Sequence, residues 1–119
     1  MKLLILLSIA SSLGLAGTWS GALVDASCYA REERNVTLRS VEVNHDRTFE
    51  IHQCAPNART KTFSVVQEDG QSFKLDTGGD AKAAHLVAAM PAKKGGVEVQ
   101  VTGEKSNETV TVSSISQLH

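Results

Sequence analysis

Regular alternation of hydrophobic and polar residues in the second half of the chain predicts a β-hairpin. Phe63 and Val65 are two positions apart, and so are Phe73 and Leu75 beyond a short polar segment. Residues at this spacing lie on one face of a strand, so we expect these four side chains to line one face of the hairpin. The intervening Glu68-Asp69-Gly70 contains an Asp-Gly pair, which favours a type I′ turn.

The C-terminal part of the chain carries the strongest strand pattern. Val97–Thr102 places three valines on one face, and Thr109–Ile115 carries Val110 and Val112 before its final isoleucine. A polar segment, Gly103–Glu108, separates the two runs and suits a turn. We therefore predict a second hairpin here.

A helix is predicted between the two hairpins. Within Ala81–Met90, hydrophobic residues recur at positions i, i+3, i+4 and i+7, which is the spacing of an amphipathic helix. They are Ala83, Leu86, Val87 and Met90. Asp80 is the predicted N-cap, because its carboxylate can accept hydrogen bonds from the free N–H groups of the first turn. Pro91 is expected to end the helix, and Lys82 and His85 lie off its hydrophobic stripe.

The first half of the chain is more polar. Thr18–Asp25 contains the hydrophobic residues of a first strand. Farther on, Val41–Val43 and Thr48–His52 alternate, and Asn44–Arg47 between them suits a turn. We therefore expect residues 26–60 to form a long loop that contains a short hairpin.

The expected order is a strand, a long insertion, two strands, a helix and two strands. Five strands with one helix between the third and the fourth is the order of the OB-fold, a small Greek-key barrel. We predict a mainly β fold: a five-stranded OB-like barrel with one helix between strands 3 and 4. The insertion, residues 26–60, then joins strands 1 and 2, a connection that this fold uses for binding.

The N-terminus has the three-part pattern of a secretory signal peptide. Lys2 supplies the positive charge, Leu3–Leu7 the hydrophobic region, and Gly14-Leu15-Ala16 the small residues that predict cleavage after Ala16. A membrane-spanning helix needs about 20 apolar residues, and serines and glycines interrupt this run too early. We therefore predict that residues 1–16 are a signal peptide and that residues 17–119 form a single exported domain, periplasmic or secreted.

The small net charge of the predicted domain limits its partners. Without Lys2 the chain has 11 Lys and Arg against 13 Asp and Glu residues, a net charge of −2. This argues against partners that are bound by bulk electrostatics, such as nucleic acid or an anionic membrane. One Trp, one Tyr and three Phe also provide little surface for base stacking. The partner we predict is instead an envelope or extracellular ligand.

Cys28 and Cys54 are the two cysteines of the chain. In an exported small domain an even number of cysteines favours a disulfide, which would stabilise the fold by about 3–4 kcal/mol. An alternative uses the same residues differently. On a strand His52 and Cys54 would point to the same side, and with Cys28 they could bind zinc or copper or act as a thiol-redox pair.

The predicted insertion balances its charges. It contains five arginines and five acidic residues: Arg31, Arg34, Arg39, Arg47, Arg59, Glu32, Glu33, Glu42, Asp46 and Glu50. We interpret them as solvated ion pairs on a surface loop. His45 and His52 lie near acidic residues and could do acid–base chemistry, but no nucleophile motif accompanies them. We predict no catalytic site, no bound cofactor and no metal.

Several short motifs resemble those of a group of small exported bacterial proteins of unknown function. These motifs are Val24-Asp25-Ala26-Ser27-Cys28-Tyr29, Cys54-Ala55-Pro56, Phe73-Lys74-Leu75-Asp76, Val99-Gln100-Val101-Thr102-Gly103 and Thr109-Val110-Thr111-Val112. The resemblance covers nearly all of the predicted domain and consists of a cysteine pair, turn glycines and strand patterns. It implies an exported small β-barrel and transfers no activity.

Two hypotheses for function follow. The first is an exported binding or structural module of the cell envelope without catalytic activity, an OB-like barrel whose residues 29–60 form the contact surface. The second is a metal-binding or thiol-redox protein that uses Cys28, His52 and Cys54.

The intact mass of the protein recovered from the export compartment separates these hypotheses. We expect the mass of residues 17–119 less two hydrogen atoms, with no metal retained in elemental analysis, because the two cysteines form a disulfide. Free thiols with bound zinc or copper would contradict the disulfide and support the metal site.

Overall fold

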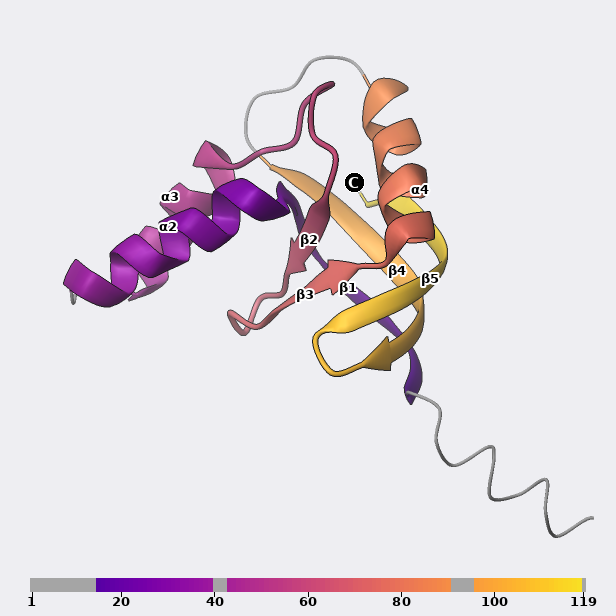
Figure 1. The fold of residues 1–119 in the computed structure, drawn as a ribbon, viewed down its shortest axis with the longest axis horizontal. Helices are drawn as coiled ribbons and strands as arrows, with labels where there is room; N and C mark the ends of the chain where they lie inside the picture. Colours follow the sequence, from indigo (N-terminus) through magenta and orange to yellow (C-terminus); the bar gives the residue numbers. More distant parts are fainter. Residues whose placement is uncertain (1–14, 40–42, 91–95, 119) are drawn as a thin grey trace, which may run out of the picture.

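The computed structural model describes residues 15–39, 43–90 and 96–118. In these ranges the chain forms five strands and three helices (Figure 1). In chain order they are β1 (Leu15–Asp25), α2 (Ala26–Arg39), α3 (Val43–Gln53), β2 (Phe63–Val66), β3 (Ser72–Leu75), α4 (Thr77–Ala88), β4 (Val97–Ser106) and β5 (Thr109–Gln117).

The five strands close into one barrel in the order β1-β2-β3-β5-β4, with β4 returning to β1. Neighbouring strands are antiparallel except β3 and β5, which pair in parallel. The long strand β1 pairs with β4 over Leu15–Leu23 and with β2 over Ala22–Asp25, so it links the two ends of the sheet. The predicted mainly β fold and five-stranded barrel are confirmed.

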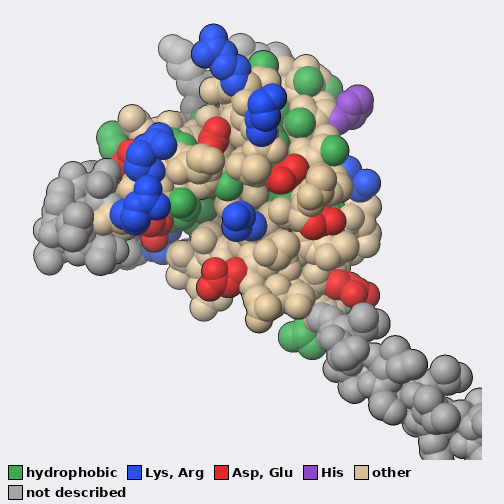
Figure 2. Space-filling model, viewed as in Figure 1, with side chains coloured by type: hydrophobic (Ala, Val, Ile, Leu, Met, Phe, Trp, Pro, Cys, Tyr) green, Lys and Arg blue, Asp and Glu red, His purple; other side chains and the backbone are tan. Residues whose placement is uncertain are grey.

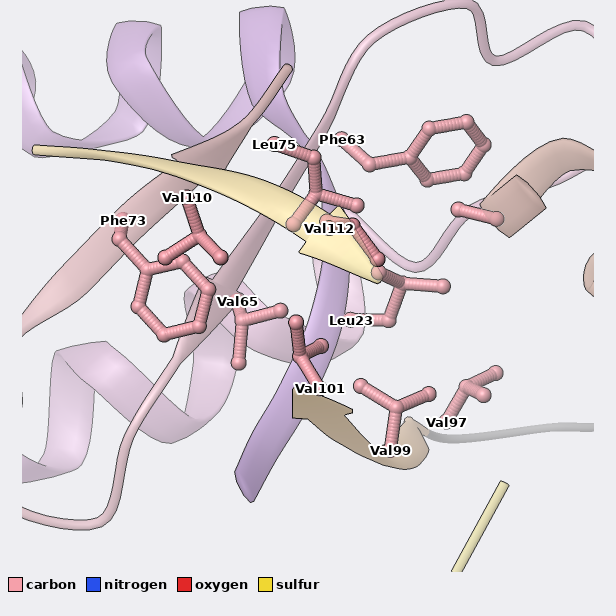
Figure 3. Packing of buried hydrophobic residues seen from close by; sticks show 11 residues of the cluster. Leu23, Phe63, Val65, Phe73, Leu75, Val97, Val99, Val101, Val110 and Val112 are labelled. Carbon is pink, nitrogen blue, oxygen red and sulfur yellow. The ribbon is translucent and has the colours of Figure 1, made fainter. Parts of the chain in front are cut away.

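Alternate positions of every strand fill the barrel interior. The side chains that the alternating pattern places on one face of each strand lie in one buried cluster, and Figure 3 shows most of its members converging from different strands. Its members are Leu23, Phe63, Val65, Phe73, Leu75, Ala83, Val97, Val99, Val101, Val110 and Val112. Each buried Val, Leu or Phe contributes about 1.5–3 kcal/mol, so this cluster is the main source of stability.

Two aromatic rings and a lysine lie inside the barrel near the β4–β5 turn. The rings of Trp19 and Phe73 meet edge to face, with their centroids 5.9 Å apart. Lys105 Nζ lies 6.0 Å from the Trp19 centroid and 5.5 Å from the Phe73 centroid. The ammonium group is attracted to the ring faces, while the half-buried lysine stem covers the aromatic pair.

A bulge in β5 lets the last hairpin curve around the barrel. Thr102 lies opposite Ser114 and Gly103 opposite Val112, so Ser113 is an extra residue between the two pairs. Such an insertion bends the strand and increases its twist. A Cβ atom on Gly103 would collide with the carbonyl of Thr111, so glycine permits the close approach of the two strands.

Helix α4 follows β3 and packs its hydrophobic stripe against the core. Ala83 is fully buried, and Leu86, Val87 and Met90 are partly buried against the main cluster, as the spacing predicts. The predicted N-cap is wrong. The helix begins four residues earlier, at Thr77, with Asp76 as the N-cap that accepts from the Gly79 N–H at 2.9 Å.

The side chain of Asp80 has a different role from the one predicted. Its carboxylate accepts from the backbone N–H of Phe63 at 3.0 Å and so connects α4 to the start of β2. Burial raises the pKa of Asp80, although the Phe63 N–H opposes this effect. The helix has its C-cap at Ala89, and Pro91 lies outside the described residues.

The β2–β3 turn also differs from the prediction. The backbone N–H of Gln67 donates to the backbone carbonyl of Gln71 at 2.8 Å, and the N–H of Gly70 donates to the backbone carbonyl of Gln67 at 2.9 Å. Three residues therefore form the loop instead of two. Gly70 has a positive φ of 93°, whereas the φ of Asp69 is not positive. Asp69 and Gly70 therefore cannot form a type I′ turn, which needs positive φ at both residues. A left-handed glycine after a tight turn is typical of three-residue hairpin loops.

The long loop and short hairpin predicted for residues 26–60 are wrong. Residues 26–39 and 43–53 form α2 and α3, which lie together on the β1–β2 side of the barrel, away from α4 (Figure 1). We call them the stapled helix pair. Asp25 begins α2 by accepting from the Cys28 N–H at 3.1 Å, as an N-cap does. The predicted strand Thr48–His52 lies within α3, and Val41 and Glu42 lie outside the described residues.

The inward face of α3 explains why its pattern suggested a strand. Residues 47, 50, 51 and 54 are spaced as one helix face, and they are half-buried or buried: Arg47, Glu50, Ile51 and Cys54. Two of the four are charged, so the buried face has no hydrophobic period. Phe49, by contrast, is 57 % exposed. Hydrophobicity alone therefore predicts the wrong face and the wrong period.

Strand β1 starts slightly before the predicted cleavage point. Leu15 and Ala16 pair with Lys105 and Glu104 of β4, and Leu15 is 77 % exposed. Cleavage after Ala16 would remove two pairs at the end of the strand and leave the rest of β1 in place. Residues 1–14 lie outside the described residues, so the signal peptide stays a prediction.

The bulge generates a prediction for Gly103→Ala. The added Cβ would displace the Thr111 carbonyl and loosen the β4–β5 pairing, so we expect a loss of about 2–4 kcal/mol in unfolding free energy. Urea denaturation followed by the fluorescence of the single tryptophan, Trp19, measures it. Gly78→Ala is the control, because a Cβ there meets only open space and the Asp76 carboxylate at 3.6 Å. Equal stability of the two variants would contradict this account.

Candidate functional site

The stapled helix pair has a small core of its own on the outer face of the barrel. Val24 of β1 and Val66 of β2 point away from the barrel interior and contact Tyr29 and Cys54. Cys28 and Ile51 pack against the edge of this cluster. The outward side chains of two strands therefore form the platform on which the helices rest.

The predicted disulfide between Cys28 and Cys54 is confirmed. It joins the first turn of α2 to the residue that follows α3, and the two Cα atoms are 5.5 Å apart. Cys54 is fully buried, and its carbonyl accepts from the Asp25 N–H at 2.8 Å. The bond therefore ties both ends of the helix pair to the end of β1.

Asp25 links three segments at the base of the helix pair. One oxygen of its carboxylate accepts from the Cys28 N–H and the other from the Thr60 hydroxyl, each at 3.1 Å. The next residue, Ala26, donates its N–H to the Thr62 carbonyl at 3.0 Å. The chain therefore leaves the barrel and returns to it at almost the same place.

The ligand set of the alternative metal site is not assembled. Both sulfurs are bonded to each other, so neither Cys28 nor Cys54 offers a thiolate. His52 lies exposed on helix α3, so the assumption that it shares one face of a strand with Cys54 is wrong. Across residues 15–39, 43–90 and 96–118 no group of three or more His, Cys, Asp and Glu side chains is placed to hold a metal ion.

A buried polar cluster lies where α2 and α3 meet the barrel. Tyr29 is 5 % exposed and Glu50 is 1 % exposed. The Tyr29 hydroxyl donates to Glu33, and burial together with the charges of Glu33 and Glu50 raises the Tyr29 pKa well above its ordinary value of 10.0. The charge of Arg47, one turn before Glu50 in α3, opposes this rise in the Tyr29 pKa.

Arg47 also contacts the β2–β3 turn. A Cβ atom on Gly70 would collide with its guanidinium group, so the arginine lies directly against the turn backbone. Arg47 and Glu50 were predicted to be solvated with the other charges of the insertion. That prediction is wrong for these two residues, because they are half-buried and buried in the contact between helix and barrel.

The outer face of the helix pair is exposed and mixed in charge. Arg31 and Arg34 of α2 are exposed, and in Figure 2 basic and acidic side chains are interspersed on the visible face of the molecule. Phe49 is the large hydrophobic side chain that α3 presents to solvent. The side chains of His45 and Asp46 lie outside the described part, so the structure does not test the acid–base chemistry considered for His45.

A second surface feature is a groove of about 810 Å³ between α4 and β5. Its walls are Gly78, Ala81, Lys82, His85 and Leu86 of α4 and Ser113, Ser114 and Ile115 of β5. His85 is exposed, as its position off the hydrophobic stripe predicts. The sequence does not signal the groove, because it forms only where the bulged strand passes the helix. His119 lies outside the described residues.

Comparisons with known proteins found no matching family model, no similar curated protein and no similar solved structure. In the described part of the chain, no helix is both long and apolar enough to span a membrane.

The raised pKa of Tyr29 predicts a loss of stability at alkaline pH. Up to about pH 10 the phenol is neutral in both the folded and the unfolded states, so its contribution to the free energy of unfolding is fully present. Above that pH the unfolded chain ionises first, and stability falls by up to about 1.4 kcal/mol per pH unit. Tyr29→Phe should remove this loss in urea denaturation at about pH 9 and about pH 11.

Tyrosinate absorbance provides a direct control, because Tyr29 is the single tyrosine of the chain. In the folded protein the absorbance should stay low at pH values where the urea-unfolded chain is already ionised. Ionisation of the folded protein near pH 10 would contradict the buried, carboxylate-facing position of the phenol.

Proposed function

We propose that this chain is an exported, OB-like binding module without catalytic activity that contacts an envelope or extracellular partner. The strand order β1-β2-β3-β5-β4, the parallel β3–β5 pair and the placement of α4 between β3 and β4 support an OB-like architecture. In that architecture the connection between strands 1 and 2 is a common binding element.

The observation that carries the proposal is the construction of this connection. The connection is a helix pair closed by a disulfide, capped by Asp25 and packed on its own small core. A preordered surface loses less conformational entropy on binding than a mobile loop does. Its exposed aromatic residue, Phe49, is of a type enriched at protein interfaces.

The chemistry of the pair favours binding over catalysis. The Tyr29 phenol stays protonated at neutral pH because its pKa is raised. The Glu50 carboxylate is buried, so a substrate in solvent cannot reach it. Both side chains are therefore buried between the helix pair and the barrel, out of reach of a dissolved substrate.

Export is supported by the predicted signal peptide and is compatible with the disulfide. Structural disulfides persist in oxidising compartments and are rare in the cytosol. A reducing compartment would remove the covalent link between the two ends of the helix pair.

Photo-crosslinking from position 49 tests the contact surface. We expect p-benzoylphenylalanine at position 49, in the full chain expressed in its source cells, to yield one discrete heavier adduct after irradiation. Mass spectrometry of that adduct identifies the partner.

The control carries the same photoreactive residue at position 111. Thr111 is exposed on β5, so an adduct that depends on the helix pair should be missing there. Absence of any adduct from position 49, or the same adduct from both positions, would refute the helix pair as the contact surface.

A further inference from the structure

The second half of β5 has an open backbone edge beside α4. β5 pairs with β3 only at Thr109 and Val110, and the Val112 N–H then donates to the Asp76 carboxylate at 3.0 Å. From Ser113 onward, no strand in the described ranges pairs with β5 on the side opposite β4. This side of the barrel therefore resembles the edge of an open sheet.

The register with β4 shows which backbone groups point outward. The Leu118 N–H donates to the Glu98 carbonyl at 2.7 Å, next to the pair Val99↔Gln117. In an antiparallel pair, alternate residues direct their N–H and C=O groups toward the partner strand and away from it. Ile115 and Gln117 therefore belong to the outward-facing set.

The groove between α4 and β5 runs along this edge. Ser113, Ser114 and Ile115 form one wall, and mainly apolar surface from Ala81 and Leu86 lines the other. Its volume of about 810 Å³ lies within the range of sites that hold ligands. A strand advances by about 3.3 Å per residue, so a short extended segment can lie along this wall of three consecutive β5 residues.

The ionisable groups of the groove are basic. Lys82 and His85 lie one turn apart on α4, and none of the lining residues is acidic. The nearest carboxylates along the chain, those of Asp76 and Asp80, do not line the groove. Asp76 accepts from Gly79 and Val112, and Asp80 accepts from Phe63. The groove therefore favours a ligand that carries negative charge.

We propose that the α4–β5 groove binds an extended acidic peptide segment of a partner protein, which adds a strand to the open edge of β5. Main-chain hydrogen bonds to the outward groups of Ile115 and Gln117 would supply affinity, as in other cases of strand addition. Lys82 and His85 would select acidic side chains, and the apolar lining would accept the alternate residues. The site lies on a different face from the stapled helix pair, so it does not depend on the function proposed for that surface.

The probe for this site is a fluorescein-labelled heptapeptide of alternating valine and aspartate. Fluorescence anisotropy with the disulfide-bonded domain should show saturable binding, weaker at high salt because the attraction includes screened charges. In NMR spectra the backbone amides of Ile115 and Gln117 should shift most. A peptide with lysine in place of aspartate should not bind.

Two controls separate strand addition from simple charge attraction. The same acidic peptide with N-methylated backbone amides keeps its charge but cannot donate to an edge, so its binding should be lost. Lys82→Glu should weaken the affinity for the acidic peptide by about fivefold or more, whereas Arg31→Glu on α2 should leave that affinity unchanged.

Three outcomes would overturn the proposal. One is equal binding of the methylated and unmethylated peptides. Another is equal weakening by Lys82→Glu and Arg31→Glu, which would indicate bulk electrostatics. The third is a dimer in sedimentation analysis that the peptide cannot displace, which would assign the edge to a second copy of the chain.

Discussion

The position of Asp25 is the constraint on which much of the structure depends. At this residue β1 leaves the barrel, α2 begins, and the chain that returns toward β2 is fixed by the Thr60 hydroxyl. The neighbouring disulfide and the bond from the Asp25 N–H to Cys54 bring the end of α3 to the same point. A long excursion can therefore interrupt two adjacent strands without loosening their pairing, because its ends are closed against each other.

The barrel presents two different surfaces because α2–α3 and α4 cover different sides of it (Figure 1). The stapled helix pair rests on the outward residues of β1 and β2, which a barrel without the insertion would leave in solvent. Helix α4 packs against the main core and flanks a strand edge that β3 is too short to cover. The first surface is closed by the disulfide and exposes Phe49, whereas the second is a groove with Lys82 and His85 on its helical wall. The two surfaces therefore present different side chains to solvent.

Sequence patterns predicted the barrel interior well and the helix pair poorly. Phe63, Val65, Phe73 and Leu75 alternate as strands do, and all four are buried. In α3 the buried face contains Arg47 and Glu50, whose burial depends on neighbours from other elements, so hydrophobic periodicity pointed to a strand. The N-cap of α4 was missed for a related reason. Asp76 and Asp80 are both suitable caps, and the choice depends on Phe63, whose N–H binds Asp80 across 17 positions of the chain.

By itself the sequence determined the strand periods, the hydrophobic stripe of α4 and the pairing of its two cysteines, because these follow from local spacing and from a count of two. The tertiary structure alone decided the helical state of residues 26–39 and 43–53, the burial of Arg47 and Glu50 and the open edge of β5. Each of these depends on contacts between residues far apart in the chain, where the free energy of burying a charge or pairing a backbone group is set by the neighbour that folding supplies.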